Sequence, residues 1–82
     1  MTIKKVLETQ KVENNLKKYN ILKQYLKAKN YILDGNTYIV DLKIRKPKIS
    51  KIYYFRINKQ YRAWGILQNE VLKIYKIDNH QN

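Results

Sequence analysis

Two arginines within one predicted β-hairpin are placed to bind a phosphate together. A three-residue loop over 58–60 joins two strand-like segments, 52–57 and 61–67, and sets Arg56 opposite Arg62 on one face of the hairpin. Like charges directly opposite each other destabilise a sheet by roughly 0.2–1 kcal/mol. Guanidinium groups, however, match phosphate oxygens in bidentate geometry. The pair therefore predicts an anion site that stabilises charge on a phosphate.

Two aromatic residues, Tyr54 and Trp64, share this face in the same register. Tyrosine and tryptophan rings beside arginines form a platform on which nucleic-acid bases stack. The alternative is that both rings are packed and that each arginine pairs with an acid, namely Asp41, Glu70 or Asp78. The opposite face of the hairpin is expected to be core, and it carries Tyr53, Phe55, Ile57, Tyr61, Ala63 and Leu67.

Two further groups of residues are candidates for phosphate chemistry. His80 is the only histidine, and an imidazole titrates near neutrality, so it can act as a general acid or base. Arg45, Lys46 and Lys48 form a basic loop that can hold backbone phosphates. The alternatives are a solvated tail residue and a solvated loop.

Other chemistries lack their residues. The chain has no cysteine, no glycine-rich phosphate loop, no nucleophile elbow and no His, Asp and Glu set with metal-ligand spacing. Any catalysis is expected to use neither a metal nor a cofactor, and to rely on cations, one histidine and hydroxyls.

The charge of the chain points to a polyanionic partner. The 82 residues carry 18 Lys and Arg against 6 Asp and Glu, a net charge of +12, which suits nucleic acid, an acidic protein or an anionic membrane surface. Residues 42–82 hold ten basic residues against two acidic ones, and 1–41 hold eight against four. The richness in Lys, Asn and Ile is the competing explanation, because composition bias alone produces it.

The length allows one domain, 1–82, with a single core. An apolar content of 44% supplies that core. No run of 18 apolar residues and no signal-peptide pattern is present. The expected location is the cytoplasm.

Helical spacing covers two segments, 9–19 and 20–33. Asn20 is expected to cap the second helix and Gly35 to end it in a left-handed conformation. The expected buried stripe runs along both helices through Val12, Leu16, Tyr19, Leu22, Leu26 and Tyr31.

Alternation of apolar residues predicts strands over 3–8, 37–44, 52–58, 61–67 and 71–77. The fold class is therefore α+β, with the two helices on one face of an antiparallel sheet and the other face open.

The segment 52–63 resembles the central hairpin of RelE/ParE-superfamily toxins, the toxin halves of bacterial type II toxin–antitoxin systems. The resemblance is carried by the aromatic-x-Phe-Arg-Ile…Tyr-Arg pattern and by the Asp-x-His at 78–80. The segment 26–29 and the loop 45–47 also look like one branch of the family. The resemblance covers most of 10–82.

This resemblance implies a β-α-α-β-β-β-β order and a function. RelE-like members cut mRNA in the ribosomal A site, where the 2′-hydroxyl attacks the adjacent phosphate and leaves a cyclic phosphate. Arg62 matches a catalytic position of the family, Arg56 another basic position, and His80 the terminal histidine of some members. The implied partners are an acidic antitoxin protein and mRNA on the ribosome, with no membrane and no small-molecule cofactor.

The chain departs from the family pattern at several positions. Gln81 stands where some members have Tyr, the loop 45–48 has no Glu base, and Ile52 and Tyr54 stand where others carry Lys. ParE-like members of the same fold inhibit DNA gyrase instead. A gyrase inhibitor and a non-catalytic RNA- or antitoxin-binding module are therefore the alternatives to an endoribonuclease.

Overall fold

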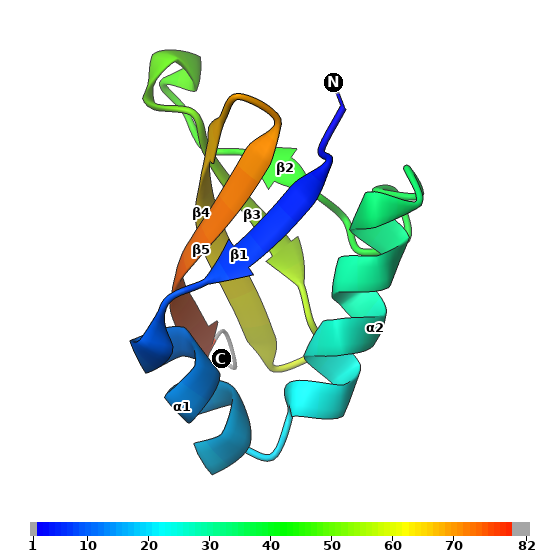
Figure 1. Cartoon of the computed structure of the whole chain (residues 1–82), viewed down its shortest axis with the longest axis vertical. Coiled ribbons are helices and arrows are strands. Elements are labelled where there is room, and N and C mark those ends of the chain that lie inside the picture. The colour runs from blue at the N-terminus through cyan, green and yellow to red at the C-terminus, as the bar shows by residue number, and fades with distance from the viewer. Residues whose placement is uncertain (1, 80–82) are drawn as a thin grey trace.

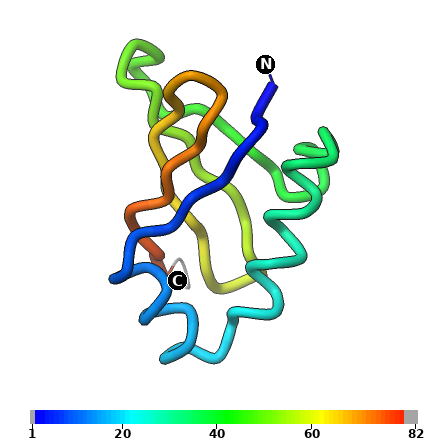
Figure 2. Tube along the Cα trace, viewed as in Figure 1, coloured from blue at the N-terminus to red at the C-terminus, as the bar shows by residue number. Residues whose placement is uncertain are grey.

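A computed structural model describes residues 2–79, in which two helices cover one face of a five-stranded sheet (Figures 1 and 2). The elements follow in the order β1 (Lys5–Glu8), α1 (Gln10–Lys18), α2 (Leu22–Leu33), β2 (Lys43–Ile44), a short 3₁₀ helix (Lys48–Ser50), β3 (Ile52–Arg56), β4 (Tyr61–Gln68) and β5 (Val71–Asn79). The predicted α+β class and β-α-α-β-β-β-β order are confirmed.

The sheet has the strand order β1-β5-β4-β3-β2. The pairs β2–β3, β3–β4 and β4–β5 are antiparallel, whereas β1 pairs with β5 in parallel. The sheet is therefore mixed, and the prediction of an antiparallel sheet is wrong at this one edge, where β1 runs parallel to β5. Since β1 and β2 lie at opposite edges, the chain between them must cross the whole sheet, and α1 and α2 make that crossing over a single face (Figure 1). The other face stays open.

The break between the two helices is a C-terminal cap of α1. Thr9 begins that helix, its side-chain oxygen accepting from the backbone N–H of Val12 at 3.1 Å. Asn20 is left-handed, with a φ of 59°, and the N–H of Ile21 donates to the carbonyl of Leu16 at 3.0 Å. The prediction that Asn20 caps the start of α2 is wrong. Its short polar side chain tolerates the left-handed conformation that ends α1.

The buried stripe of α2 also differs from the predicted one. Tyr25, Ala28 and Ile32 are buried, whereas Leu26 is 46% exposed. Because the left-handed Asn20 ends α1, α1 and α2 are not one continuous helix. The helical spacing therefore starts again in α2, and the predicted buried stripe does not continue from one helix into the next. Gly35 ends α2 as predicted, with a φ of 83°.

The segment 37–44 is not the predicted strand. Residues 37–41 form turns, and only Lys43–Ile44 pairs, as β2. The N–H of Asp41 donates to the carbonyl of Tyr38 at 3.2 Å, and Asp41 is left-handed. These local hydrogen bonds form in place of strand pairing over 37–41. The segment instead folds over the end of β3, where the N–H of Arg56 donates to the carbonyl of Val40 at 2.8 Å.

The helical layer is tied to the first strand by a shared acceptor. The hydroxyl of Tyr25 donates to Glu8 Oε2 at 2.7 Å, and Lys29 Nζ donates to the same oxygen at 2.9 Å. Burial, and then the bond to Glu8, raises the pKa of the Tyr25 hydroxyl. The hydroxyl therefore stays protonated and remains a donor, which joins α2 to β1.

The β4–β5 ladder contains a bulge at a glycine. Trp64 pairs with Lys76 but Gly65 pairs with Ile74, so β5 has one extra residue. A methyl group on Gly65 would lie 2.8 Å from Ile74 Cδ1 and 2.9 Å from the carbonyl oxygen of Lys73. Only a residue without a Cβ allows this close approach.

We expect Gly65→Ala to lower the free energy of unfolding by roughly 1–3 kcal/mol, because the added methyl overpacks a buried bulge. Urea denaturation of the two proteins measures the change. Gln68→Ala, on an exposed residue of the same strand, should differ from wild type by less than about 0.5 kcal/mol. Equal stability of the two variants would show that the bulge can absorb a side chain.

Candidate anion-binding face

The open face of the sheet is rich in cations. Residues paired in register point to the same side of a sheet, and the pairs Lys43–Tyr54, Tyr54–Trp64, Arg56–Arg62 and Trp64–Lys76 link four strands. We call this surface the basic face and define it by Lys43, Tyr54, Arg56, Arg62, Trp64 and Lys76. It has four cations around two aromatic rings.

The opposition of the two arginines has the predicted register. Arg56 pairs with Arg62, Phe55 with Ala63 and Tyr54 with Trp64. Phe55 and Ala63 are fully buried on the helical side, so the alternation of the two faces is as predicted.

A side chain in the turn sets this register. Asn58 Oδ1 accepts from the backbone N–H groups of Gln60 and Tyr61, both at 2.8 Å, and the N–H of Ile57 donates to the carbonyl of Tyr61 at 2.9 Å. Asn58 Nδ2 also donates to Gln24 Oε1 of α2 at 2.8 Å. The turn at 58–60 was predicted, but this role of Asn58 was not, although asparagine is common in such turns because its side chain bonds to the backbone two residues on.

The two aromatic rings stack on each other. The ring centroids of Tyr54 and Trp64 are 4.6 Å apart with an interplanar angle of 26°. The Arg62 guanidinium lies 5.4 Å from the Tyr54 centroid, and Lys76 Nζ lies 5.9 Å from the Trp64 centroid. Each ring therefore already contacts the other ring and a cation, which agrees with the alternative in which both rings are packed. In this arrangement the rings position cations, and a base would have to displace a neighbour to stack on them.

Lys76 also belongs to the basic face, although it was not among the predicted site residues. If β4 and β5 paired regularly from the two-residue turn at 69–70, Tyr75 would lie opposite Trp64. The bulge beside Gly65 adds one residue to β5, so Lys76 takes that position instead. The only indication of this shift in the sequence is the glycine at position 65 within the strand.

The indole N–H of Trp64 is buried and has no hydrogen-bond acceptor among the described residues. An unsatisfied buried donor costs roughly 1–3 kcal/mol. Such groups are rare in native proteins. This one lies within the cluster of cations.

The two arginines differ in their acidic neighbours. Arg56 Nη2 lies 3.6 Å from Asp41 Oδ2, and Lys43 Nζ lies 3.6 Å from the same oxygen. Arg56 thus follows the alternative in which it pairs with an acid. Within residues 2–79 no carboxylate oxygen lies within 4.0 Å of the Arg62 side chain, although Asp78 is its register partner on β5.

The predicted basic loop lies at the far end of β3. Arg45, Lys46 and Lys48 are exposed, and the N–H of Arg45 donates to the carbonyl of Ile52 at 2.8 Å. Ile52 and Arg56 are the two ends of the strand, which at about 3.3 Å per residue are roughly 13 Å apart. The loop and the arginine pair are therefore separate groups with the aromatic pair between them. His80 lies outside the described residues.

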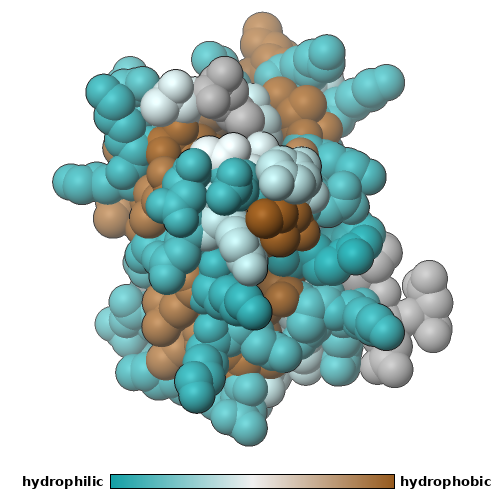
Figure 3. Space-filling model, turned by 90° about the vertical axis from the view of Figure 1, so that its right-hand side faces the viewer, coloured by the Kyte–Doolittle hydropathy of each residue, from teal (hydrophilic) through white to brown (hydrophobic). Residues whose placement is uncertain are grey.

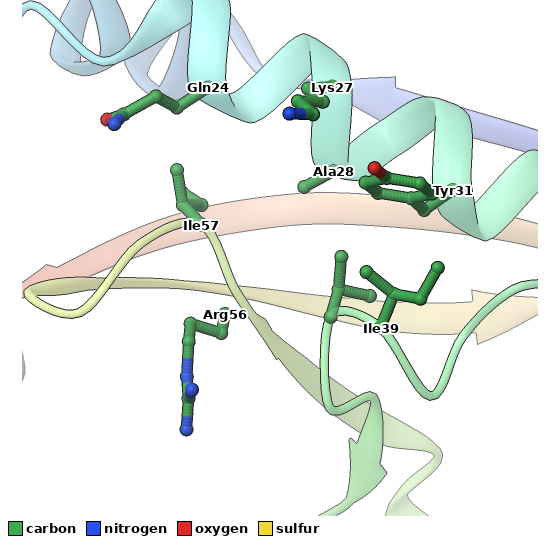
Figure 4. Close-up of a pocket in the computed structure, with 8 residues that line it drawn as sticks. Gln24, Lys27, Ala28, Tyr31, Ile39, Arg56 and Ile57 are labelled. Carbon is green, nitrogen blue, oxygen red and sulfur yellow. The ribbon is translucent and has the colours of Figure 1, made fainter.

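A cleft of about 340 Å³ adjoins Arg56 between α2 and residues 39–40 (Figure 4). It is lined by Gln24, Lys27, Ala28, Tyr31, Ile39, Val40, Arg56 and Ile57. The Arg56 side chain points away from α2 in this view, so its guanidinium serves the basic face and not the cleft. The α2 side of the molecule is mostly hydrophilic, with separate hydrophobic patches (Figure 3).

Comparisons of the chain with models of known families, with curated proteins and with solved structures give no match. Among the described residues, no helix is both long enough and apolar enough to cross a membrane. The same residues contain no group of three or more His, Cys, Asp or Glu that could hold a metal ion. The chemistry of the basic face is thus the basis for a functional proposal.

We expect Asn58→Ala to lower the free energy of unfolding by about 1–2 kcal/mol, because two backbone donors of the turn lose their acceptor. Amide hydrogen exchange should become faster at Gln60 and Tyr61. Asn58→Asp is the matched control, since it keeps an acceptor oxygen for both donors. Unchanged exchange in Asn58→Ala would show that the backbone alone sets the register.

Proposed function

We propose that this protein is a RelE-like toxin, a ribosome-dependent endoribonuclease that cleaves mRNA without a metal ion. The observation that carries the proposal is the opposition of Arg56 and Arg62 on an open sheet face. Two like charges in register are unfavourable unless an anion lies between them. The resemblance of residues 52–63 to the RelE/ParE hairpin, together with the β-α-α-β-β-β-β order, supports the same class.

In this mechanism the 2′-hydroxyl of one nucleotide attacks the phosphate that follows it. The new O2′–P bond forms as the P–O5′ bond breaks, which leaves a 2′,3′-cyclic phosphate and a 5′-hydroxyl. Arg62 and Arg56 stabilise the negative charge that gathers on the five-coordinate phosphorus. His80 supplies the proton to the leaving 5′-oxygen, or takes the proton from the 2′-hydroxyl.

An open face suits a long polyanion better than a cleft does. The four cations of the basic face lie on four neighbouring strands, and Arg45, Lys46 and Lys48 extend the positive charge to the far end of β3. An RNA strand lying along β3 would meet the basic loop and the arginine pair in turn. The net charge of +12 adds a general attraction for the backbone phosphates.

The proposed partners follow from the charge of the face. The substrate is mRNA on the ribosome, so the proposed location is the cytoplasm. The proposed inhibitor is an acidic antitoxin protein that covers the basic face. The proposed reaction needs no small-molecule cofactor.

A non-catalytic role on the same face is the second candidate. Binding requires only the cations, whereas cleavage also requires groups that transfer protons. The titratable groups beside the two arginines are the carboxylates of Asp41 and Asp78. A ParE-like gyrase inhibitor or a module that binds RNA or an antitoxin would use the same arginines. Cleavage on ribosomes separates the two candidates.

We expect the wild-type protein to cleave mRNA on programmed ribosomes, and Arg62→Ala and His80→Ala each to reduce the rate by roughly 10²–10⁴-fold. Primer extension on the mRNA measures the cut. Lys18→Ala is the charge-matched control, because Lys18 is exposed at the end of α1. Absence of cleavage by the wild type, or equal cleavage by all variants, would contradict the enzymatic proposal and leave the binding candidate.

A further inference from the structure

We infer that Lys43 and Arg56 form a phosphate subsite of the basic face, and that the carboxylate of Asp41 occupies this subsite in the free protein. The ligand class is a phosphodiester of a single-stranded RNA. The inference rests on the proposed RNA-binding role of the basic face, but it does not depend on cleavage. It assigns Asp41 the role of an internal competitor for the substrate.

One carboxylate oxygen meets both cations. Asp41 Oδ2 lies 3.6 Å from Lys43 Nζ and 3.6 Å from Arg56 Nη2. An anionic oxygen shared by a lysine and an arginine is the arrangement that a phosphate oxygen adopts. The carboxylate therefore stands in for the phosphate.

The occupant is held weakly enough to leave. The side chains of Lys43, Arg56 and Asp41 are 57%, 55% and 48% exposed. Ion pairs with this exposure contribute little and are screened by salt. A phosphodiester that brings two anionic oxygens and further contacts along the strand can displace the carboxylate.

The subsite adjoins Arg62, and no carboxylate oxygen of residues 2–79 lies within 4.0 Å of the Arg62 side chain. Arg56 is the register partner of Arg62, whose guanidinium lies over Tyr54. When Asp41 leaves, Arg56 and Arg62 can both face one phosphate or two successive ones. In the free protein, the Asp41 carboxylate offsets part of the repulsion between the two arginines, which is itself only roughly 0.2–1 kcal/mol.

The backbone holds the carboxylate at this position. The N–H of Asp41 donates to the carbonyl of Tyr38, and the preceding residue, Val40, accepts from the N–H of Arg56 at 2.8 Å. Asp41 is left-handed, with a φ of 58°, and asparagine tolerates that conformation as well as aspartate does. Asp41→Asn therefore removes the charge and keeps the turn.

The test is the affinity for a short fluorescent oligoribonucleotide of mixed sequence, measured by fluorescence anisotropy. Asp41→Asn should bind about three- to tenfold more tightly than wild type, because the competing carboxylate is gone. Asp34→Asn makes the same change in net charge at the exposed C-terminal end of α2. The tightening should be clearly smaller in that control. Equal affinities of the two variants would overturn the inference.

A double-mutant cycle tests whether the effect passes through the subsite. In a background with Lys43→Gln and Arg56→Gln, adding Asp41→Asn should no longer improve affinity. An undiminished improvement would overturn the subsite, because the carboxylate would then act on the RNA from elsewhere. Urea unfolding of each variant verifies that the comparison is between folded proteins.

The outcomes separate this inference from the proposed function. If RNA binds and depends on Arg62, but Asp41→Asn behaves like Asp34→Asn, the subsite fails and the function stands. If Asp41→Asn tightens binding but ribosomes show no cleavage, the subsite stands and the enzymatic proposal fails. Absence of oligoribonucleotide binding by every variant overturns the subsite, and the cleavage assay on ribosomes then decides the proposed function by itself.

Discussion

The two hydrogen bonds that Asn58 Oδ1 accepts in the β3–β4 turn are the contacts on which the site depends. They fix a three-residue loop, and the loop length fixes the register. With a register shifted by one residue, Arg62 would lie opposite Ile57, and the arginine pair and the core face would be lost together. The same turn is tied to α2 through Gln24, so the register and the helical layer support each other.

The basic face keeps its cations in place by two different interactions. Aromatic rings hold Arg62 and Lys76, and no carboxylate oxygen of residues 2–79 lies within 4.0 Å of either side chain. A single carboxylate, Asp41, holds Lys43 and Arg56. In the proposed function, a phosphate would meet one pair of cations directly and would gain the other pair by displacing Asp41. This difference gives the two opposed arginines unequal roles despite their symmetric places in the hairpin.

The open face exists because the chain crosses the sheet only once. β1 and β2 are at opposite edges, and the helical pair between them covers one face. The α+β class and the Arg56–Arg62 register were predictable, because strand alternation, loop length and helical spacing are local properties. Whether the arginine face acts on RNA stays a prediction, and the interpretation of His80 stays one too, since it lies outside the described residues.

The order of the elements, the left-handed end at Gly35 and the two faces of the central hairpin followed from the amino-acid pattern alone. Which helical stripe is buried depended on the packed fold, because a left-handed Asn20 ended α1 and changed the phase of α2. The packed fold also decided that residues 37–41 fold as turns, which brings Asp41 to Arg56. The bulge beside Gly65 decided that Lys76, and not Tyr75, faces Trp64. Alternation along a strand gives its faces, but which residues meet across strands depends on bulges and turns that form only when the layers pack together.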